Sequence, residues 1–173
     1  MIDQRLGEAA RTIATMDWAG WAIFGLLATG ALTAVMIGAQ LGGVTRLDLP
    51  LMLGSIVVLD PDQARVTGLF MHVAIGQGFA LGYAAAFAEL DRASWWLGAL
   101  LGVLHGAVAL LVIVPLLPGV HPHMASERAG LSSRAGLEPP GLFGLNYGRE
   151  TPVVTMLAHV AFGAALGLLL HPS

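Results

Sequence analysis

The sequence of 173 residues contains no cysteine. This absence excludes disulfide bonds, thiolate metal ligands and cysteine nucleophiles. Lysine is missing too, because all eight basic residues are arginines, and mechanisms that need a Schiff-base lysine are thereby excluded. An arginine-only set of basic residues fits a bacterial genome rich in G and C.

Charge is also scarce. Charged residues make up 11% of the chain and hydrophobic residues 56%, whereas a soluble domain usually carries about 25% charged residues. The chain therefore has too little polar material to cover a globule in water. The net charge of −3 and the lack of a basic cluster argue against nucleic acid as a partner. The composition predicts a protein whose surroundings are a lipid bilayer.

Charged residues divide the chain into four long apolar windows. These windows lie between Asp17 and Arg46, between Arg65 and Glu89, between Arg92 and Glu127, and after Glu150. A helix needs about 20 apolar residues to cross the ~30 Å hydrocarbon core of a bilayer, and each window is long enough. We expect membrane-spanning helices at 18–40, 66–88, 93–116 and 151–170. The predicted fold is all-α, a four-helix transmembrane bundle that forms one multi-pass domain over 1–173, placed in a bacterial inner membrane.

Two shorter helices are expected beside the spans. Before the first span, apolar residues recur at helical spacing opposite charged ones, which predicts an amphipathic helix on the membrane surface. Between the first two spans, Asp48 can cap a helix that has Pro50 in its first turn. This apolar piece is too short to cross a membrane, so a short interfacial helix is expected. The Gly-, Pro-, Ser- and Arg-rich stretch 118–150 is expected to be a long loop on the same side of the membrane.

Glycine spacing predicts how the spans pack, because small residues let membrane helices approach closely. Ladders with a spacing of four occur in the second, third and fourth spans, at Gly78 and Gly82, at Gly98, Gly102 and Gly106, and at Gly163 and Gly167. We expect all three ladders to lie at helix–helix contacts.

Glycine packing does not account for three histidines inside the spans, His72, His105 and His159. Ionisable residues inside a membrane are costly and usually face the bundle interior. At about 1.5 Å per residue, His72 and His159 lie roughly 10 Å, and His105 roughly 15 Å, from the same membrane side. We therefore expect the three imidazoles to meet between the helices.

Imidazole is a common ligand of transition metals, so copper, iron or zinc is one expected cofactor. In this hypothesis His72, His105 and His159 are the ligands, and additional ligands come from His121, His123 and Met156. Thioethers beside imidazoles favour copper among these metals. Gln77, one turn beyond His72, is the expected residue that orients a ligand.

A b-type haem is the alternative cofactor. His72 and His159 lie at matching depth, and Gly76 and Gly163 follow them by one turn, where small residues would leave room for a macrocycle. The alternative to both cofactors is a purely structural role for the histidines. A single membrane histidine often hydrogen-bonds a backbone carbonyl or a threonine on a neighbouring helix.

The stretch "DLPLMLG" before the second span and the pattern His-x3-Gly in the second and fourth spans carry a resemblance. With these features the chain resembles small four-span bacterial integral membrane proteins of unknown function. The resemblance covers most of the chain and implies only the fold.

Two classes of function follow from the sequence. The first is a membrane protein with a His-lined metal or haem site near one membrane face, with a role in redox chemistry or metal handling. The alternative is a non-catalytic accessory or scaffold subunit, which binds itself or a larger membrane complex through glycine-rich faces. A small transporter or channel, formed as an oligomer, ranks third because the spans carry few polar groups. Whether the protein is an enzyme is left open.

Overall fold

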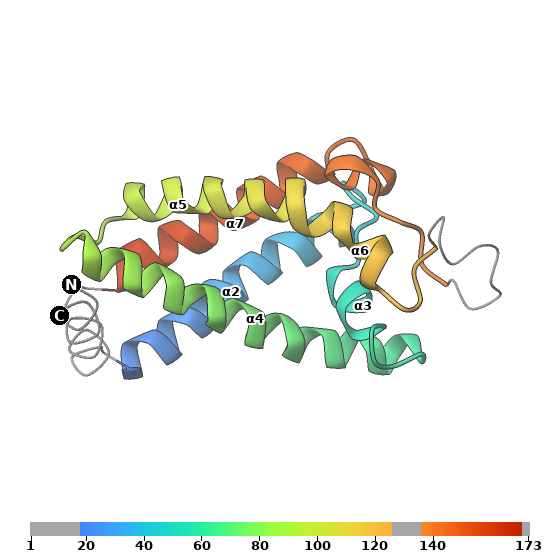
Figure 1. Ribbon diagram of the computed structural model, residues 1–173, viewed down its shortest axis with the longest axis horizontal. Helices are drawn as coiled ribbons and strands as arrows, with labels where there is room; N and C mark the ends of the chain where they lie inside the picture. The colour runs from blue at the N-terminus through green and yellow to red at the C-terminus, as the bar shows by residue number, and fades with distance from the viewer. Residues whose placement is uncertain (1–17, 126–135, 171–173) are drawn as a thin grey trace, which may run out of the picture.

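The computed structural model describes residues 18–125 and 136–170. The predicted amphipathic helix before residue 18 lies outside the described residues, as does part of the predicted loop. The described residues are almost entirely helical, and the elements are α2 (Trp18–Leu41), α3 (Leu49–Gly54), α4 (Pro61–Glu89), α5 (Trp95–Val108), a π-helical turn (Ala109–Ile113), α6 (Val114–Val120), a 3₁₀ segment (Leu142–Tyr147) and α7 (Thr151–Leu169). The predicted all-α fold is confirmed (Figure 1).

Four helices are long and apolar enough to cross a membrane. They are Trp18–Leu41, Pro61–Glu89, Trp95–Val120 and Thr151–Leu169. The third combines α5, the π-helical turn and α6 into one continuous helix of 26 residues. These bounds confirm the four predicted spans, with the largest differences at the start of the second and the end of the third.

The second span starts five residues earlier than predicted because its first turn is well capped. The Asp60 side chain accepts a hydrogen bond from the Gln63 backbone N–H at 2.9 Å, and Pro61 occupies the first turn. An N-cap carboxylate followed by proline is a strong helix start. Asp60 and Pro61 therefore begin the helix, ahead of the predicted start at residue 66.

The third span continues through Pro115 by changing its hydrogen-bond register. Proline has no N–H to donate to the carbonyl four residues earlier. The π-helical turn Ala109–Ile113 comes directly before this proline. Such a turn is one of the ways in which a helix accommodates an interruption of its hydrogen-bond ladder. The helix then runs on to Val120 with Pro118 inside its last turns.

The short helix between the first two spans is confirmed. Asp48 accepts a hydrogen bond from the Leu51 N–H at 3.0 Å, as its capping position predicts. The helix packs against α4 with backbones in close contact, because a β-carbon at Gly54 would overlap the Ala64 carbonyl. Arg65 of α4 also bonds Asp48 at 2.8 Å. In Figure 1, α3 and α6 lie at the same end of the bundle.

The segment before α7 is ordered by interactions with the loop after α2. The Arg46 N–H donates to the Tyr147 carbonyl at 2.7 Å, and the Arg46 side chain pairs with Glu138 at 3.3 Å. The Tyr147 hydroxyl donates to the Glu138 carbonyl oxygen at 2.5 Å. Burial raises the pKa of Tyr147, the nearby Glu138 carboxylate raises it further, and Arg46 opposes the increase. The described part of the predicted loop therefore contains a compact 3₁₀ segment.

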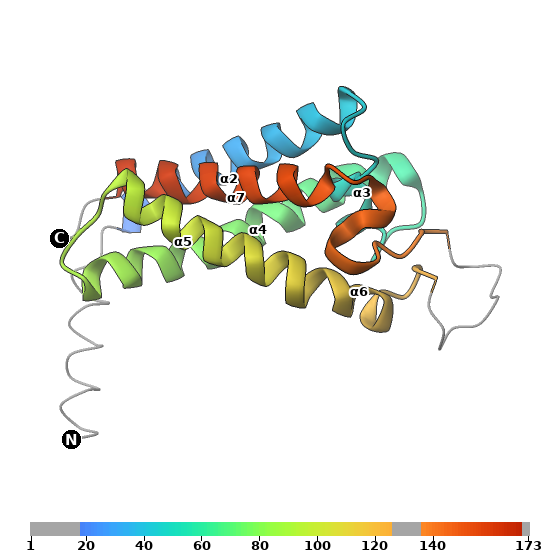
Figure 2. The same cartoon turned by 90° about the horizontal axis from the view of Figure 1, so that it is seen from above.

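Helices α5 and α7 form the closest pair in the bundle and run side by side (Figure 2). A β-carbon added to Gly98 would overlap the Gly163 carbonyl oxygen, and one added to Gly102 would overlap the His159 carbonyl oxygen. Gly167 likewise meets the Ser94 backbone. The predicted ladders of the third and fourth spans are therefore confirmed as helix–helix contacts, with backbone met at four of the five glycines and the Met156 side chain met at Gly106.

The predicted ladder of the second span is wrong. A β-carbon at Gly78 or at Gly82 would meet no atom within 4 Å. The glycines of α4 that touch neighbours are Gly68, against the Pro50 backbone, and Gly76, against the Thr29 side chain. Spacing alone could not tell which of two glycine sets faces the bundle.

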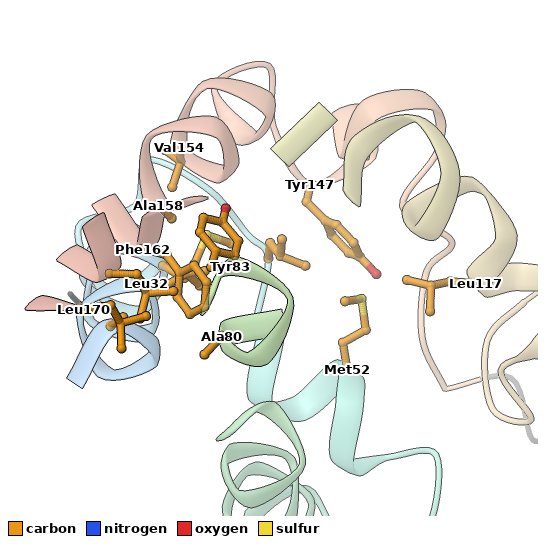
Figure 3. Close-up of a cluster of buried hydrophobic side chains, with 14 of the residues drawn as sticks. Leu32, Met52, Ala80, Tyr83, Leu117, Tyr147, Val154, Ala158, Phe162 and Leu170 are labelled. Carbon is orange, nitrogen blue, oxygen red and sulfur yellow. The ribbon is translucent and has the colours of Figure 1, made fainter. Parts of the chain in front are cut away.

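The apolar core lies between α2, α4 and α7. Phe87, Phe162 and Leu166 are among its fully buried side chains. Figure 3 shows Tyr83 beside Phe162, whose ring centroids lie 5.4 Å apart, and Tyr147 close to Met52 and Leu117 nearer the loops. Large apolar side chains also cover the outside of the bundle, for example Leu26, Phe70 and Leu104.

We predict opposite effects for two glycine-to-alanine substitutions. Gly98→Ala should lower the free energy of unfolding by about 1–3 kcal/mol, because the added methyl group overpacks a backbone contact. Gly78→Ala should leave it unchanged or raise it by up to about 1 kcal/mol, because alanine favours helix and meets open space. Thermal unfolding in detergent micelles measures both, and equal effects of the two substitutions would contradict the described α5–α7 contact.

Candidate binding site

A cavity of about 140 Å³ lies inside the bundle. Side chains of all four spans and of α3 line it, and most of them are apolar. The polar side chains in its wall are Thr29 from α2, His72 from α4, His105 from α5, and Thr155 and His159 from α7. Thus the three histidines that the sequence singled out line a single cavity, although they come from three different helices.

Two of the three imidazoles touch each other. The ring centroids of His105 and His159 lie 4.6 Å apart with the rings nearly perpendicular. The His105 ring also stacks on Phe79 of α4 at a centroid distance of 3.9 Å. His105 therefore lies between α4 and α7 and contacts both.

His72 is held by a threonine of the neighbouring helix. Its Nδ1 lies 2.9 Å from the Thr33 hydroxyl oxygen. The single hydroxyl proton of Thr33 is already donated to the Thr29 carbonyl, at 2.7 Å. Thr33 must therefore accept, and His72 donates from Nδ1–H. In a neutral imidazole with the proton on Nδ1, Nε2 carries a free lone pair.

His159 has the same protonation pattern for a different reason. Its Nδ1 lies 2.7 Å from the Thr155 carbonyl oxygen of the preceding turn. A carbonyl oxygen can only accept, so His159 also donates from Nδ1–H. Its neutral ring again leaves Nε2 as an acceptor. Two helices thus bring two imidazoles to one cavity, each with its Nδ1 proton engaged by the protein.

Two other polar atoms in the cavity wall are buried without a partner among the described residues. These atoms are Nδ1 of His105 and the hydroxyl oxygen of Thr155. Thr155 is 5% exposed. A buried polar group without a hydrogen bond costs about 1–3 kcal/mol, and such groups are rare in folded proteins. Both atoms belong to residues that line the cavity.

The cavity carries no fixed charge. Among the described residues, those that line it include no aspartate, glutamate, lysine or arginine. In the same part of the chain, no group of three or more His, Asp or Glu side chains is arranged so that it could hold a metal ion. The three histidines share a cavity, but they do not form a closed three-histidine metal centre.

The two loop histidines do not reach the cavity. His121 donates from Nε2 to the Met52 carbonyl at 2.9 Å, and its Nδ1 accepts the His123 backbone N–H at 3.1 Å. His123 donates from Nδ1 to the Ser55 carbonyl at 2.6 Å. Both therefore hold the C-terminal end of α3 against the loop. Since both ring nitrogens of His121 are engaged, this geometry does not support its predicted role as an additional ligand.

Met156 and Gln77 also lie elsewhere than the sequence suggested. Met156 packs over Gly106, with its sulfur 3.0 Å from the position of an added β-carbon, and it does not line the cavity. Gln77 donates to the Ala22 carbonyl at 2.8 Å and joins α4 to α2. The residue that orients His72 is Thr33.

Thr33, Thr155 and Met52 were not predicted from the sequence. The two threonines hold or accompany the imidazoles, and Met52 lines the cavity. A signal for Thr33 was present, because Gly25, Thr29 and Thr33 recur every four residues and each threonine hydroxyl bonds the carbonyl one turn earlier. Which helix this threonine ladder faces depends on the tertiary packing.

Neighbouring helices fill the space beside the two glycines that were predicted to leave room for a haem. A β-carbon on Gly76 would overlap the Thr29 side chain, and one on Gly163 would overlap the Gly98 backbone. The cavity of about 140 Å³ is also smaller than pockets for drug-sized ligands, which measure roughly 300–1,000 Å³. This geometry offers no room for a macrocycle, and haem remains a prediction without structural support.

Comparison with protein-family models, with curated proteins and with solved structures finds no match to this chain. The resemblance to small four-span membrane proteins therefore stays a prediction.

We predict the ring tautomers from these hydrogen bonds. In ¹⁵N spectra of histidine-labelled protein, neutral His72 and His159 should both carry the proton on Nδ1. Thr33→Val should change the signals of His72 alone, because it removes the acceptor. Thr155→Val is the matched control, because His159 donates to the Thr155 carbonyl, which the substitution retains. A proton on Nε2 of His72 in the unaltered protein would contradict the assignment.

Proposed function

We propose that this chain is an integral membrane protein that binds a small, bilayer-soluble molecule in the histidine-lined cavity. The ligand has the size of one aromatic ring and donates hydrogen bonds, as a phenol or a quinol does. The two neutral imidazoles of His72 and His159 accept these bonds at Nε2.

Placement in a membrane is supported by the four long apolar helices and by their exposed surfaces. Leu26 is 50% exposed, Phe70 70% and Leu104 62%, all within the spans. Side chains of this size on the outside of every span suit contact with lipid tails. Localisation to a bacterial inner membrane is part of the proposal.

The observation that carries the proposal is the protonation pattern of the two imidazoles. Each Nδ1–H is engaged by a threonine hydroxyl or carbonyl, so each ring presents a lone pair and no proton at Nε2. A hydrogen-bond donor complements such a site, and a neutral ligand avoids the cost of bringing charge into an apolar interior.

The size of the cavity limits the ligand. An apolar cavity of about 150 Å³ can hold one benzene molecule, and the cavity here measures about 140 Å³. The aromatic ring of Phe162 and the aliphatic side chain of Ile75 are among its walls. These apolar walls favour a flat ring whose hydroxyl groups reach the imidazoles.

Hydroquinone and benzene test this proposal because they share a ring and differ in their donors. His72→Leu should weaken hydroquinone binding roughly two- to tenfold, since one hydrogen bond contributes roughly 0.5–1.5 kcal/mol. Benzene binding should not weaken. Met71→Leu is the control, because Met71 precedes His72 on α4 and lies outside the cavity. Calorimetry on protein in lipid nanodiscs gives the affinities.

Three results would overturn the proposal. They are the absence of hydroquinone binding by the unaltered protein, equal effects of His72→Leu on hydroquinone and on benzene, and equal weakening by Met71→Leu. The His72→Leu protein is expected to fold, because Thr33 keeps its bond to the Thr29 carbonyl.

A soft metal ion is the second candidate occupant, and copper is favoured. Met36 and Met52 line the same cavity as the three histidines, and thioethers with imidazoles suit Cu(I). The cost of burying an ion rises steeply with its charge. Without a carboxylate in the wall, monovalent copper is therefore easier to bury than divalent zinc or iron.

Metal analysis separates the two occupants, which compete for one small space. If copper is the ligand, protein purified under reducing conditions should contain about one copper per chain, and Met36→Leu should lower that content. Hydroquinone binding should then be weak until copper is removed. A copper-free protein that binds hydroquinone, with an affinity unchanged by Met36→Leu, would exclude copper as the occupant.

A further inference from the structure

Helices α4 and α5 follow each other in the chain but hardly pack together. α5 packs along α7, whereas α4 packs on α2 and α3. In Figure 1 the two helices diverge from the short connection that joins them. This arrangement leaves a seam on the side of the bundle between α4 and α5.

An apolar groove of about 210 Å³ occupies this seam. Its walls include Phe79, Gly82 and Tyr83 of α4 and Leu101 and Leu104 of α5. Gly82 and Leu104 are exposed, so the groove opens on the outside of the bundle, where lipid tails lie if the protein spans a membrane. A molecule dissolved in the bilayer can therefore reach this groove without crossing water.

The groove and the cavity share two wall residues. Phe79 and His105 line both, and their rings are stacked at a centroid distance of 3.9 Å. This one pair of stacked side chains, one from each helix, separates the two spaces. The groove is therefore the lateral neighbour of the cavity, and a molecule extends from one into the other only when the Phe79 and His105 rings move apart.

Two buried polar atoms mark this junction. The hydroxyl of Tyr83 has no hydrogen-bond partner among the described residues, although the side chain is only 6% exposed. The ring centroids of Tyr83 and His105 lie 6.1 Å apart, and Nδ1 of His105 is also unpartnered. Apolar lipid cannot satisfy either atom. A ligand with a polar group at the junction can, because buried polar groups need a partner.

We propose that the groove holds the tail of the same molecule whose ring occupies the cavity. The ligand is then an alkylated phenol or quinol, with its ring against His72 and His159. Its tail leaves the bundle between α4 and α5 when the Phe79 and His105 rings move apart, and this movement also uncovers the Tyr83 hydroxyl for a polar atom near the ring. This inference rests on the proposed function and specifies its ligand class.

The groove determines whether a ligand with a tail can enter the cavity, and it adds little to the affinity of that ligand. A tail gains little apolar burial on moving from lipid into an equally apolar groove. The unaltered protein should therefore bind hydroquinone and a decyl-substituted hydroquinone with similar affinity, once partition into the bilayer is taken into account. Blocking the groove should exclude only the molecule with the tail.

Gly82→Leu provides this block. The substitution should be tolerated, because a β-carbon at Gly82 meets no atom within 4 Å, and the added side chain lies in the groove. It should weaken binding of decyl-hydroquinone at least tenfold and that of hydroquinone less than twofold. Gly78→Leu is the matched control, since Gly78 is equally open and lines neither space. It should change neither affinity.

Tyr83→Phe tests the polar contact separately. Removal of a buried hydroxyl without a partner should leave the thermal stability of the ligand-free protein unchanged or higher. It should weaken decyl-hydroquinone binding several-fold if the hydroxyl bonds the ligand. A clear loss of stability together with unchanged affinity would show that the hydroxyl serves the fold.

The outcomes separate this inference from the proposed function. If hydroquinone binds but Gly82→Leu leaves decyl-hydroquinone affinity intact, the groove inference is overturned and the proposed function stands. The same holds if Gly78→Leu weakens binding equally, or if only hydroquinone binds the unaltered protein. If neither compound binds, both proposals are wrong.

Discussion

Inside an apolar bundle every polar atom must find a partner within the protein or its ligand, because neither lipid nor the core supplies one. This constraint organises the described structure. Threonine hydroxyls of α2 bond carbonyls one turn earlier, and Thr33 thereby becomes an acceptor for His72. The Thr155 carbonyl is the corresponding acceptor for His159. A few side-chain atoms of the described residues are left without partners. Three of them belong to residues that line the cavity or the adjoining groove: His105 Nδ1, the Thr155 hydroxyl and the Tyr83 hydroxyl.

Close backbone packing makes this arrangement possible. Gly98 and Gly102 bring α5 against α7 and place His105 beside His159, while Gly76 lets α4 approach Thr29 of α2. Because α5 packs on α7 while α4 packs on α2 and α3, α4 and α5 stay apart. The cavity and its lateral groove therefore follow from where the small residues lie. The packed helices position the imidazoles, and the stacked rings of Phe79 and His105 separate the cavity from the groove.

Much of the fold could be predicted from the sequence, because charge-free windows of sufficient length have few alternatives in a membrane. The meeting of His72, His105 and His159 also followed from their depth along the spans. Their chemistry could not be predicted from the sequence, because the role of an imidazole depends on which of its nitrogens is engaged. The partner that engages His72 is Thr33, which is 39 residues away in the chain. Three other features depend on the rotation of each helix about its axis, which uniformly apolar spans do not specify. They are the inward-facing glycines of α4, the engaged ring nitrogens of His121 and the position of Gln77. The scaffold alternative for the function and the oligomeric channel stay predictions.

The central claim is that Nε2 of His72 and Nε2 of His159 accept hydrogen bonds from one ring-sized ligand. The most direct test is an experimental structure of the protein in lipid nanodiscs, determined with saturating hydroquinone. The account predicts density for one ring in the cavity, with hydroxyl oxygens about 2.7–3.2 Å from both Nε2 atoms. A metal ion at this position, or a cavity whose imidazoles bond only protein groups while hydroquinone lies elsewhere, would contradict it.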